Sequence, residues 1–496
     1  MHFVDMKLLQ RTSFLAVLLV ATSILNATTL LVGPGQTYAN PQQAASIAQP
    51  GDTILITAGE YRGTFWIENL QGSELAPIVL RGTDSALVRF VGGTESMHFS
   101  DCAYLIIENM TVTAQTGNGM NIDDGGSVET PTHHIVIRSV AFDSMDAAGN
   151  NDMLKLSGLD DFEITHCSFT RGADGGSGID MVGCHSGRIV DNVFTSLGSN
   201  AIQAKGGTQF IAILRNTFTH AGQRAVNLGG STGLQFFRPI DAPYEAADLF
   251  VGANIFRGSV APIAYVGCAR VAVINNTIID PERWVFRILQ ETVDPSRFVP
   301  CGDNIFANNL VIHTNAISTQ VNIGANTDPE SFTLQNNLWY NSSDPSRSQW
   351  SNPQLTQTTS LYGLDPQLSQ QLQPSPTSPC KAQGAILSQW LPLTHDRYEQ
   401  PYGVPPSIGA VEISQPTSVG RSEQKQALCE LEPGVYTGVA VDVTGRMVDG
   451  VRVTVDETIS IDHQYAAISA GPWWLVVPSE DRTVILPMYG RSLIRD

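Results

Sequence analysis

The chain has 496 residues, of which only 15% are charged, and its formal net charge is -19 at pH 7. An acidic chain without basic runs disfavours a nucleic-acid partner, and an acidic ligand would need a local cationic pocket. The 44 glycines and the recurring asparagines favour turn-rich β-structure over helices.

The first segment has the features of an export signal. Lys7 and Arg11 precede an apolar run from Phe14 to Leu25, and Ala27 is a plausible cleavage edge. A membrane anchor is the alternative, but the run is shorter than a bilayer span. We therefore expect residues 1–27 to be a signal peptide and the mature chain to have no transmembrane segment.

Five short stretches in the middle of the chain share one pattern. Each ends in glycine and alternates inward apolar with outward positions, which predicts a strand with one buried face. The first four repeat every 23 to 25 residues, and strands of a second type, such as FEITHCSF (162–169), follow them. This period, with two or three strands per unit, predicts a right-handed parallel β-helix over residues 28–413. The stretches are DMLKLSG (152–158), SGIDMVG (177–183), NAIQAKG (200–206), RAVNLGG (224–230) and APIAYVG (261–267).

An asparagine recurs at one register of the second strand type. Stacked about 4.8 Å apart, such side-chain amides can donate to the next coil and accept from the previous one. We therefore interpret them as a structural column rather than as glycan-binding groups. They are Asn192, Asn216, Asn276, Asn309 and Asn337.

The period is interrupted once and then fades. Residues 231–248 form an insertion, and such insertions in solenoids are loops that often wall a binding face. The proline-rich stretches 364–385 and 395–412 resemble the closing coil of many right-handed parallel β-helix proteins. A polar linker, 414–425, leads to alternating residues at 426–496 that predict a small antiparallel β-sandwich.

Two C-terminal motifs carry a resemblance. VDVTGRMVDG (441–450) and GPWWLVVPSEDRTVILPMYGR (471–491) resemble the sorting domain of the type IX secretion system. The resemblance implies that the secretion machinery of a Gram-negative bacterium delivers the protein to the cell surface or the medium. An accessory sandwich that binds carbohydrate through Trp473 and Trp474 is the alternative.

The sequence offers no clear metal site. Seven cysteines without a CxxC motif argue against zinc, and we expect buried single cysteines, although one or two disulfides are an alternative. Calcium is compatible with the pair Asp123-Asp124 before two glycines, but a turn is the preferred interpretation.

Outward positions of the first strand type form polar columns. The fourth position holds Lys155, Asp180, Gln203 and Asn227, and the sixth position holds Lys205. Neighbouring coils bring such groups within reach of one ligand. This mixture of amides, one carboxylate and two ammonium groups suits a polysaccharide.

Further candidates lie close to these columns in the sequence. Arg224 and Arg238 would add positive charge, and the rings of Phe236, Phe237 and Tyr244 would stack on sugars. The chemistry that follows is β-elimination on a uronic acid, in which Lys205 removes the proton beside the carboxylate. Flanking cations, or a metal, would neutralise the developing charge.

The block NVFTSLGSNAIQAKGGTQFIAILRNTFTHAGQRAVNLGG (192–230) resembles polysaccharide lyase family 6, β-helix enzymes that act on alginate or chondroitin-type chains. Lys205 matches the catalytic lysine of that family, and Asn216 matches a structural asparagine. Gly229 stands where the family has its catalytic arginine, and Gly198-Ser199-Asn200 stand where it has calcium-binding carboxylates.

The leading hypothesis is a secreted protein that acts on acidic polysaccharide, as a divergent lyase using Lys205 and Arg224. A non-catalytic glycan-binding or adhesive solenoid, in which Lys205 only covers the surface and pairs with Asp180, is the alternative. An epimerase shares the proton-abstraction step. Hydrolysis needs two facing carboxylates, whereas Asp152 and Asp180 occupy different strand registers.

Overall fold

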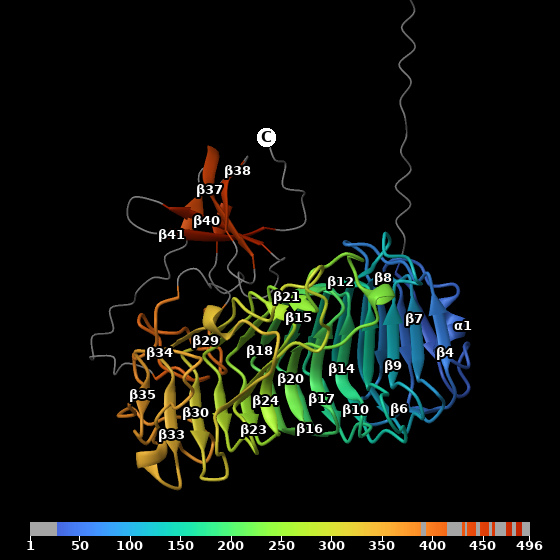
Figure 1. Cartoon of the computed structure of the whole chain (residues 1–496). Coiled ribbons are helices and arrows are strands. Elements are labelled where there is room, and N and C mark those ends of the chain that lie inside the picture. Colours follow the sequence, from blue (N-terminus) through green and yellow to red (C-terminus); the bar gives the residue numbers. More distant parts are fainter. Residues whose placement is uncertain are drawn as a thin grey trace, which may run out of the picture.

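The computed structural model describes residues 27–387 and 393–413 and the backbone of six strands beyond them; the main body is a parallel β-helix (Figure 1). Strands of successive coils lie side by side along the solenoid in chain order. Helix α1 (Pro41–Ala45) is the one α-helix in the described part of the chain. The all-β solenoid predicted from the sequence is confirmed.

One face of the solenoid is a ten-stranded parallel sheet, called the front sheet below. It contains the five stretches of the first strand type as direct neighbours, with the register Leu154–Ile179–Ile202–Val226–Ile263. All five side chains are fully buried, as period-two alternation requires. The strands are β4 (Phe65–Glu68), β7 (Met97–Ser100), β9 (Met120–Asp123), β11 (Leu154–Ser157), β14 (Ser177–Val182), β17 (Asn200–Lys205), β20 (Arg224–Gly229), β24 (Ala261–Val266), β28 (Phe286–Leu289) and β31 (Val321–Ile323).

The remaining faces belong to one large sheet, to which a typical coil contributes two strands. Every pairing in this sheet is parallel, so each coil stacks directly on the next. Its strands are β1 (Thr29–Val32), β2 (Thr53–Ile56), β3 (Gly59–Tyr61), β5 (Ile78–Gly82), β6 (Val88–Val91), β8 (Ala103–Thr113), β10 (Thr132–Asp143), β12 (Leu159–Thr165), β13 (Ser168–Thr170), β15 (His185–Val190), β16 (Val193–Leu197), β18 (Thr208–Leu214), β19 (Thr217–Ala221), β21 (Ala246–Ala247), β22 (Phe250–Gly252), β23 (Ile255–Arg257), β25 (Cys268–Ala269), β26 (Ala272–Ile274), β27 (Thr277–Ile279), β29 (Ile305–Ala307), β30 (Leu310–His313), β32 (Thr333–Gln335), β33 (Leu338–Asn341), β34 (Gln357–Thr358) and β35 (Leu361–Tyr362).

The bend between the two strands of the large sheet is built from a residue pair. The first residue is in the left-handed region, as Arg215 is with φ 55°, and the second is a buried asparagine. Asn216 accepts from the backbone N–H of Asn192 at 2.9 Å and donates to the carbonyl of Ile189 at 2.8 Å. The same bonds recur along the column, which confirms the predicted role of these amides and adds Asn254 to them. The asparagine ladder consists of Asn192, Asn216, Asn254, Asn276, Asn309 and Asn337.

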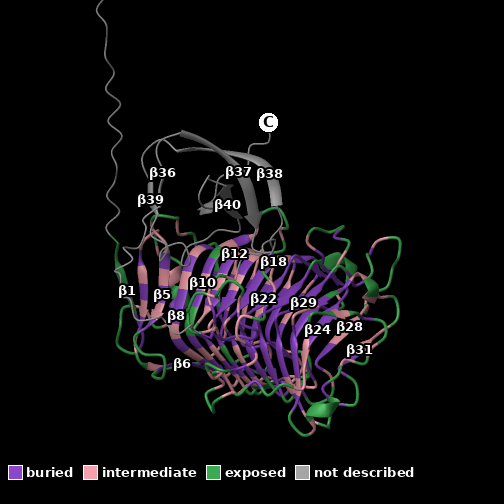
Figure 2. Ribbon diagram, turned by 90° about the vertical axis from the view of Figure 1, so that its left-hand side faces the viewer, coloured by how far each residue is buried: buried purple, intermediate pink, exposed green. Residues whose placement is uncertain are grey.

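A column of phenylalanine rings lies inside the coils, two residues after the ladder positions. Neighbouring rings are nearly parallel, with centroids 4.6 to 4.9 Å apart. Figure 2 shows the buried stripes that run through the strands around this core. The column consists of Phe142, Phe169, Phe194, Phe218 and Phe256.

The two ends of the solenoid are finished differently. β1 already pairs with β2, so the stack begins close to the start of the predicted β-helix, and α1 buries Ala44 against the core. Residues 364–387 and 393–412 do not close the stack but run back over the large sheet. Arg397 donates to the carbonyl of Arg215 at 2.6 Å, and Asn275 donates to that of Ser407 at 2.8 Å. The returning segment takes this course because the outside of the large sheet carries apolar residues, such as Leu214, which the segment helps to cover.

The C-terminal strands pair antiparallel, as the alternation predicted. β36 (Cys429–Leu431) pairs with β39 (Ile459–Ile461). β37 (Gly434–Asp442), β38 (Met447–Val455), β40 (Trp473–Pro478) and β41 (Thr483–Met488) form a four-stranded sheet. Their packing into a sandwich and the sorting role stay predictions. Residues 1–26 of the predicted signal peptide and the linker 414–425 lie outside the described residues.

Two further findings concern the described residues only. None of their helices is long and apolar enough to cross a membrane. Their cysteines are buried and unpaired, with the sulfur atoms of Cys268 and Cys301 3.9 Å apart. The expectation of buried single cysteines is confirmed for Cys102, Cys167, Cys184, Cys268, Cys301 and Cys380.

Candidate functional site

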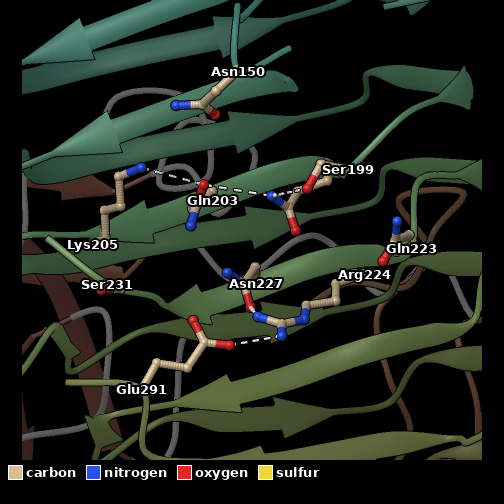
Figure 3. A pocket seen from close by; sticks show the side chains of 10 residues that line it. Asn150, Ser199, Gln203, Lys205, Gln223, Arg224, Asn227, Ser231 and Glu291 are labelled. Atoms are coloured by element: carbon tan, nitrogen blue, oxygen red, sulfur yellow. Dashed lines mark hydrogen bonds and ion pairs between the residues drawn. The ribbon is translucent and has the colours of Figure 1, made fainter. Parts of the chain in front are cut away.

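A polar hollow of about 320 Å³ lies on the outer surface of the front sheet (Figure 3). Strands β17 and β20 provide its floor, and residues of the adjoining loops complete its wall. Every lining side chain is polar, with two cations and one carboxylate among amides and hydroxyls. The lining residues are Asn150, Ser199, Asn200, Gln203, Lys205, Gln223, Arg224, Asn227, Ser231 and Glu291.

The register of the front sheet explains how these residues meet. Lys155 pairs with Asp180, Asp180 with Gln203, and Gln203 with Asn227, while Lys205 pairs with Val182. The predicted column is therefore one continuous outward row. Gln203, Asn227 and Lys205 line the hollow, whereas Lys155 and Asp180 lie beside it.

Lys205 is held from below by a buried carboxylate. Its Nζ lies 3.1 Å from Oδ1 of Asp180, at an angle that makes the contact an ion pair rather than a hydrogen bond. The same Nζ donates to Oε1 of Gln203 at 3.4 Å. The Lys205 side chain is 13% exposed and that of Asp180 only 1%. The charge nearest to Lys205 is therefore negative.

Asp180 is shared with a second lysine. Lys155 Nζ contacts the other oxygen of Asp180 and lies 3.6 Å from Oδ2 of Asp152. Burial lowers the pKa of Lys155, but the two carboxylates outweigh burial and raise it, so Lys155 keeps its proton. Burial and the nearby Asp180 raise the pKa of Asp152 to about 6. Of the two lysines, only Lys205 faces the hollow with a single carboxylate partner.

Arg224 occupies the opposite side of the hollow. Its guanidinium donates to Oδ1 of Asn227 at 3.2 Å and to Oε1 of Glu291 at 2.7 Å. Figure 3 shows Asn227 and Gln203 between the two cationic groups. The floor thus presents ammonium, two amides and guanidinium in sequence, with Asn227, which is 1% exposed, beneath the others.

A buried carboxylate holds the wall beside Lys205. Glu245 is fully buried and accepts from the backbone of Gly206 at 3.0 Å and of Thr232 at 2.9 Å. It also accepts from the hydroxyl groups of Thr232 at 2.7 Å and Thr292 at 2.6 Å. This single side chain ties together the turn after β17, the start of the insertion and the loop after β28.

The second predicted arginine is elsewhere. Arg238 donates to both carboxylate oxygens of Asp160, at 2.7 and 2.8 Å, and to the carbonyl of Gly183 at 3.0 Å. Its charge is used to fix the insertion onto the turns beside the front sheet. The prediction that Arg238 contributes positive charge to the site is therefore wrong.

The aromatic residues of the insertion do not form a stacking surface in the hollow. Phe237 is 1% exposed and packs with Phe298 at a centroid distance of 5.4 Å, which contradicts its predicted role. Tyr244 is half-buried against the same cluster, below the guanidinium of Arg270. Phe236 is 62% exposed, but it does not line the hollow.

The described residues contain no group of three or more His, Cys, Asp or Glu side chains that could hold a metal ion. Asp123 accepts from the N–H of Gly125, and Asp124 from that of Gly126, so this stretch is a turn, as the preferred interpretation held. Asp123 also binds the ring of His98 at 2.6 Å.

The sequence did not single out several lining residues. Asn200 begins the stretch NAIQAKG, and Ser199 directly precedes it, but neither belongs to the outward positions that held the candidates. Glu291 and Glu245 carry no repeat signal, because each reaches the site from a loop.

This geometry defines a class: a parallel β-helix with a polar, partly cationic hollow on one sheet. No family model matches the sequence, and no curated protein matches it. Solved structures with the same fold include the pectate lyase Pel9A, with a TM-score of 0.51, 14% identity and coverage of 78% of this chain and 97% of that one. The PL6 family alginate lyase AlyGC has a TM-score of 0.42 and 15% identity, with coverage of 78% of this chain and 59% of that one. A complex of XylC with xylose has a TM-score of 0.44 and 12% identity, with coverage of 78% of this chain and 98% of that one. At 14% identity the likeness to Pel9A concerns the fold alone.

Proposed function

We propose that the hollow binds an acidic, uronate-containing polysaccharide and cleaves it by β-elimination. The observation that carries the proposal is the placement of Lys205 and Arg224 on opposite sides of one polar hollow. The amides and hydroxyls between them suit the hydroxyl groups of sugars. The shared fold with a pectate lyase agrees with the proposal but fixes no substrate.

In this reaction Lys205 is the base, and Arg224 binds the uronate carboxylate. The proton beside the carboxylate moves to Nζ, and the electron pair of that C–H bond forms a new C=C bond. The glycosidic C–O bond breaks, and the leaving oxygen takes a proton from water. The guanidinium stabilises the negative charge that develops on the carboxylate.

The contacts of the two lysines explain why Lys205 rather than Lys155 is the base. Lys155 lies between two carboxylates, which hold its proton. The charge of Lys155 also offsets the negative charge of Asp180, which therefore attracts Lys205 less strongly. Lys205 faces the hollow, where a base must lie to reach the proton of a bound substrate.

The test is ultraviolet absorbance of unsaturated products from a panel of alginate, pectate and glycosaminoglycans. Lys205→Ala should lower turnover by about 10²–10⁴-fold, the usual contribution of a general base. The control is Lys381, the third lysine of residues 27–413, which lies away from the front sheet. Lys381→Ala should leave turnover unchanged. Equal activity of Lys205→Ala and the unmodified protein would contradict the assignment.

A second candidate function is glycan binding without cleavage. It is favoured by one observation, namely that Lys205 and Arg224 both already have a carboxylate partner. This alternative predicts no absorbance with any polymer of the panel. It also predicts retarded migration in gels that contain the bound polysaccharide, and loss of that retardation in Arg224→Ala.

A further inference from the structure

The front sheet continues beyond the hollow with a second group of cations. In the outward row, Asn227 pairs with Ala264, and Ala264 pairs with Arg287 of β28. Arg287 is half-buried and donates to Oδ1 of Asn322 at 3.0 Å. Its guanidinium carbon lies 4.8 Å from the centre of the Trp284 ring.

Arg287 has no carboxylate partner among the residues that the structure describes, although a half-buried charge normally has one. Within the described residues neither Arg287 nor Arg283 forms an ion pair, although Arg283 lies over the same Trp284 ring at 4.1 Å. Burial and the neighbouring charge of Arg224 lower the pKa of Arg287. Arg224 pairs with Glu291, whereas the nearby guanidinium groups of Arg287 and Arg283 add positive charge without a carboxylate of their own in the described chain, an arrangement that a bound anion would relieve.

The opposite end of the front sheet is different. His98 lies between two carboxylates, 3.0 Å from Glu95 and 2.6 Å from Asp123. Lys155 likewise lies between Asp152 and Asp180. Each cation of that end is therefore balanced within the protein, so the excess positive charge of this face lies from β20 onward.

We propose that Arg287, with Arg283 and Trp284, forms a second subsite that binds another acidic group of the same polysaccharide. The inference rests on the proposed function for the choice of ligand. Two coils separate Asn227 from Arg287, which is about 10 Å along the solenoid axis. The residue between them, Ala264, offers only a methyl group and is fully covered, so it supplies no polar contact of its own. The substrate class is therefore a polymer whose acidic groups recur at about this spacing or closer, lying along the axis.

The chemistry recognised is an anionic sugar substituent, either a carboxylate or a sulfate. Titration with polyuronate oligosaccharides and with sulfated glycosaminoglycan oligosaccharides distinguishes the two sources. Tighter binding of one class identifies the group that the subsite takes. A neutral oligosaccharide of equal length is the control ligand.

The test is calorimetric binding to Arg287→Gln, which removes the charge but keeps a polar side chain of similar length. Binding of a long acidic oligosaccharide should weaken on the order of tenfold or more, the usual effect of losing a hydrogen-bonded charge. A short oligosaccharide that fills only the hollow should bind as tightly as before. Arg257→Gln, at an exposed arginine of β23 on the large sheet, is the matched control and should change neither.

The outcomes separate this inference from the proposed function. Weaker binding in Arg287→Gln without any elimination activity would support the subsite and overturn the lyase. Unchanged binding in Arg287→Gln, together with loss of binding in Arg224→Ala, would overturn the subsite but still support ligand binding in the hollow. Arg283→Gln, at an exposed position, provides a second variant with the same expected direction should Arg287→Gln not fold.

Discussion

Two polar columns run along this solenoid, and they obey opposite rules. The asparagine ladder repeats one residue at the bend of coil after coil, fully buried, with its amides bonded to the neighbouring coils. The outward row of the front sheet changes at every coil, from Lys155 to Asp180 to Gln203 to Asn227. Repetition satisfies a need that every coil has, whereas the outward row is not bound to one residue type by such a need and differs from coil to coil. In a repeat protein, the irregular polar column is therefore the place to look for function.

The largest effect is expected inside the coils, where repetition serves packing. Phe218 is 1% exposed and stacks on Phe194 and Phe256. Phe218→Ala should lower the free energy of unfolding by about 3–5 kcal/mol, because neighbouring coils cannot collapse into the cavity. Urea unfolding measures this change. Phe236→Ala, which removes an exposed ring, should stay within about 0.5 kcal/mol, and an equal loss in both variants would contradict the stacking argument.

The next effect concerns the ladder itself. Asn254 accepts from the backbone N–H of Asn216 at 2.8 Å and donates to the carbonyl of Ile213 at 2.8 Å. Asn254→Ala leaves these buried groups without partners and should cost about 2–3 kcal/mol. The comparison is Asn150→Ala, at an exposed position of the hollow, measured in the same urea series. A cost below about 0.5 kcal/mol for Asn254→Ala would mean that water replaces the amide.

The ladder also illustrates what the sequence could predict. Strict spacing identified the coils and five of the six amides, because each coil repeats the same local physics. Asn254 was not predicted because it follows the insertion 231–248, which shifts the spacing of the repeat. Likewise, the register of the front sheet was predictable from one alignment of Leu154 with Ile179.

The site was less predictable, because its walls come from outside the repeat. Glu291 reaches the hollow, and Glu245 anchors its wall, from loops whose course the repeat does not describe. Arg238 and Phe237 were adjacent to the right strand in the sequence, yet the insertion folds so that both are used to anchor it. A residue in a strand inherits its direction from the repeat, whereas a residue in a loop does not.

A smaller effect should depend on pH, at the balanced end of the front sheet. Burial lowers the pKa of His98, but its bonds to Asp123 and Glu95 raise it to about 9, from 6.5 in the unfolded chain. The stabilisation is therefore complete below pH 6.5 and is lost as the pH rises through about 9. His98→Gln should cost roughly 1–2 kcal/mol at pH 6, allowing for solvent screening, and little at pH 9.5. An identical cost at both pH values would show that His98 acts through packing alone, for instance through its contact with Trp66.

The smallest effect on stability is expected in the irregular column, and it sharpens the comparison most. Gln203 is half-exposed, and its bonds to Lys205 and Asn200 are both long, at 3.4 Å. Gln203→Ala should therefore change the free energy of unfolding by less than about 1 kcal/mol. Because its amide lies between Lys205 and Arg224, the same variant should weaken binding of acidic oligosaccharide several-fold. Measured side by side, Asn254→Ala should lose stability and keep affinity, and Gln203→Ala should do the reverse. If Gln203→Ala were as unstable as the ladder variant with its affinity intact, the outward row would be a structural column like the ladder, and the polar hollow would lose its meaning as a site.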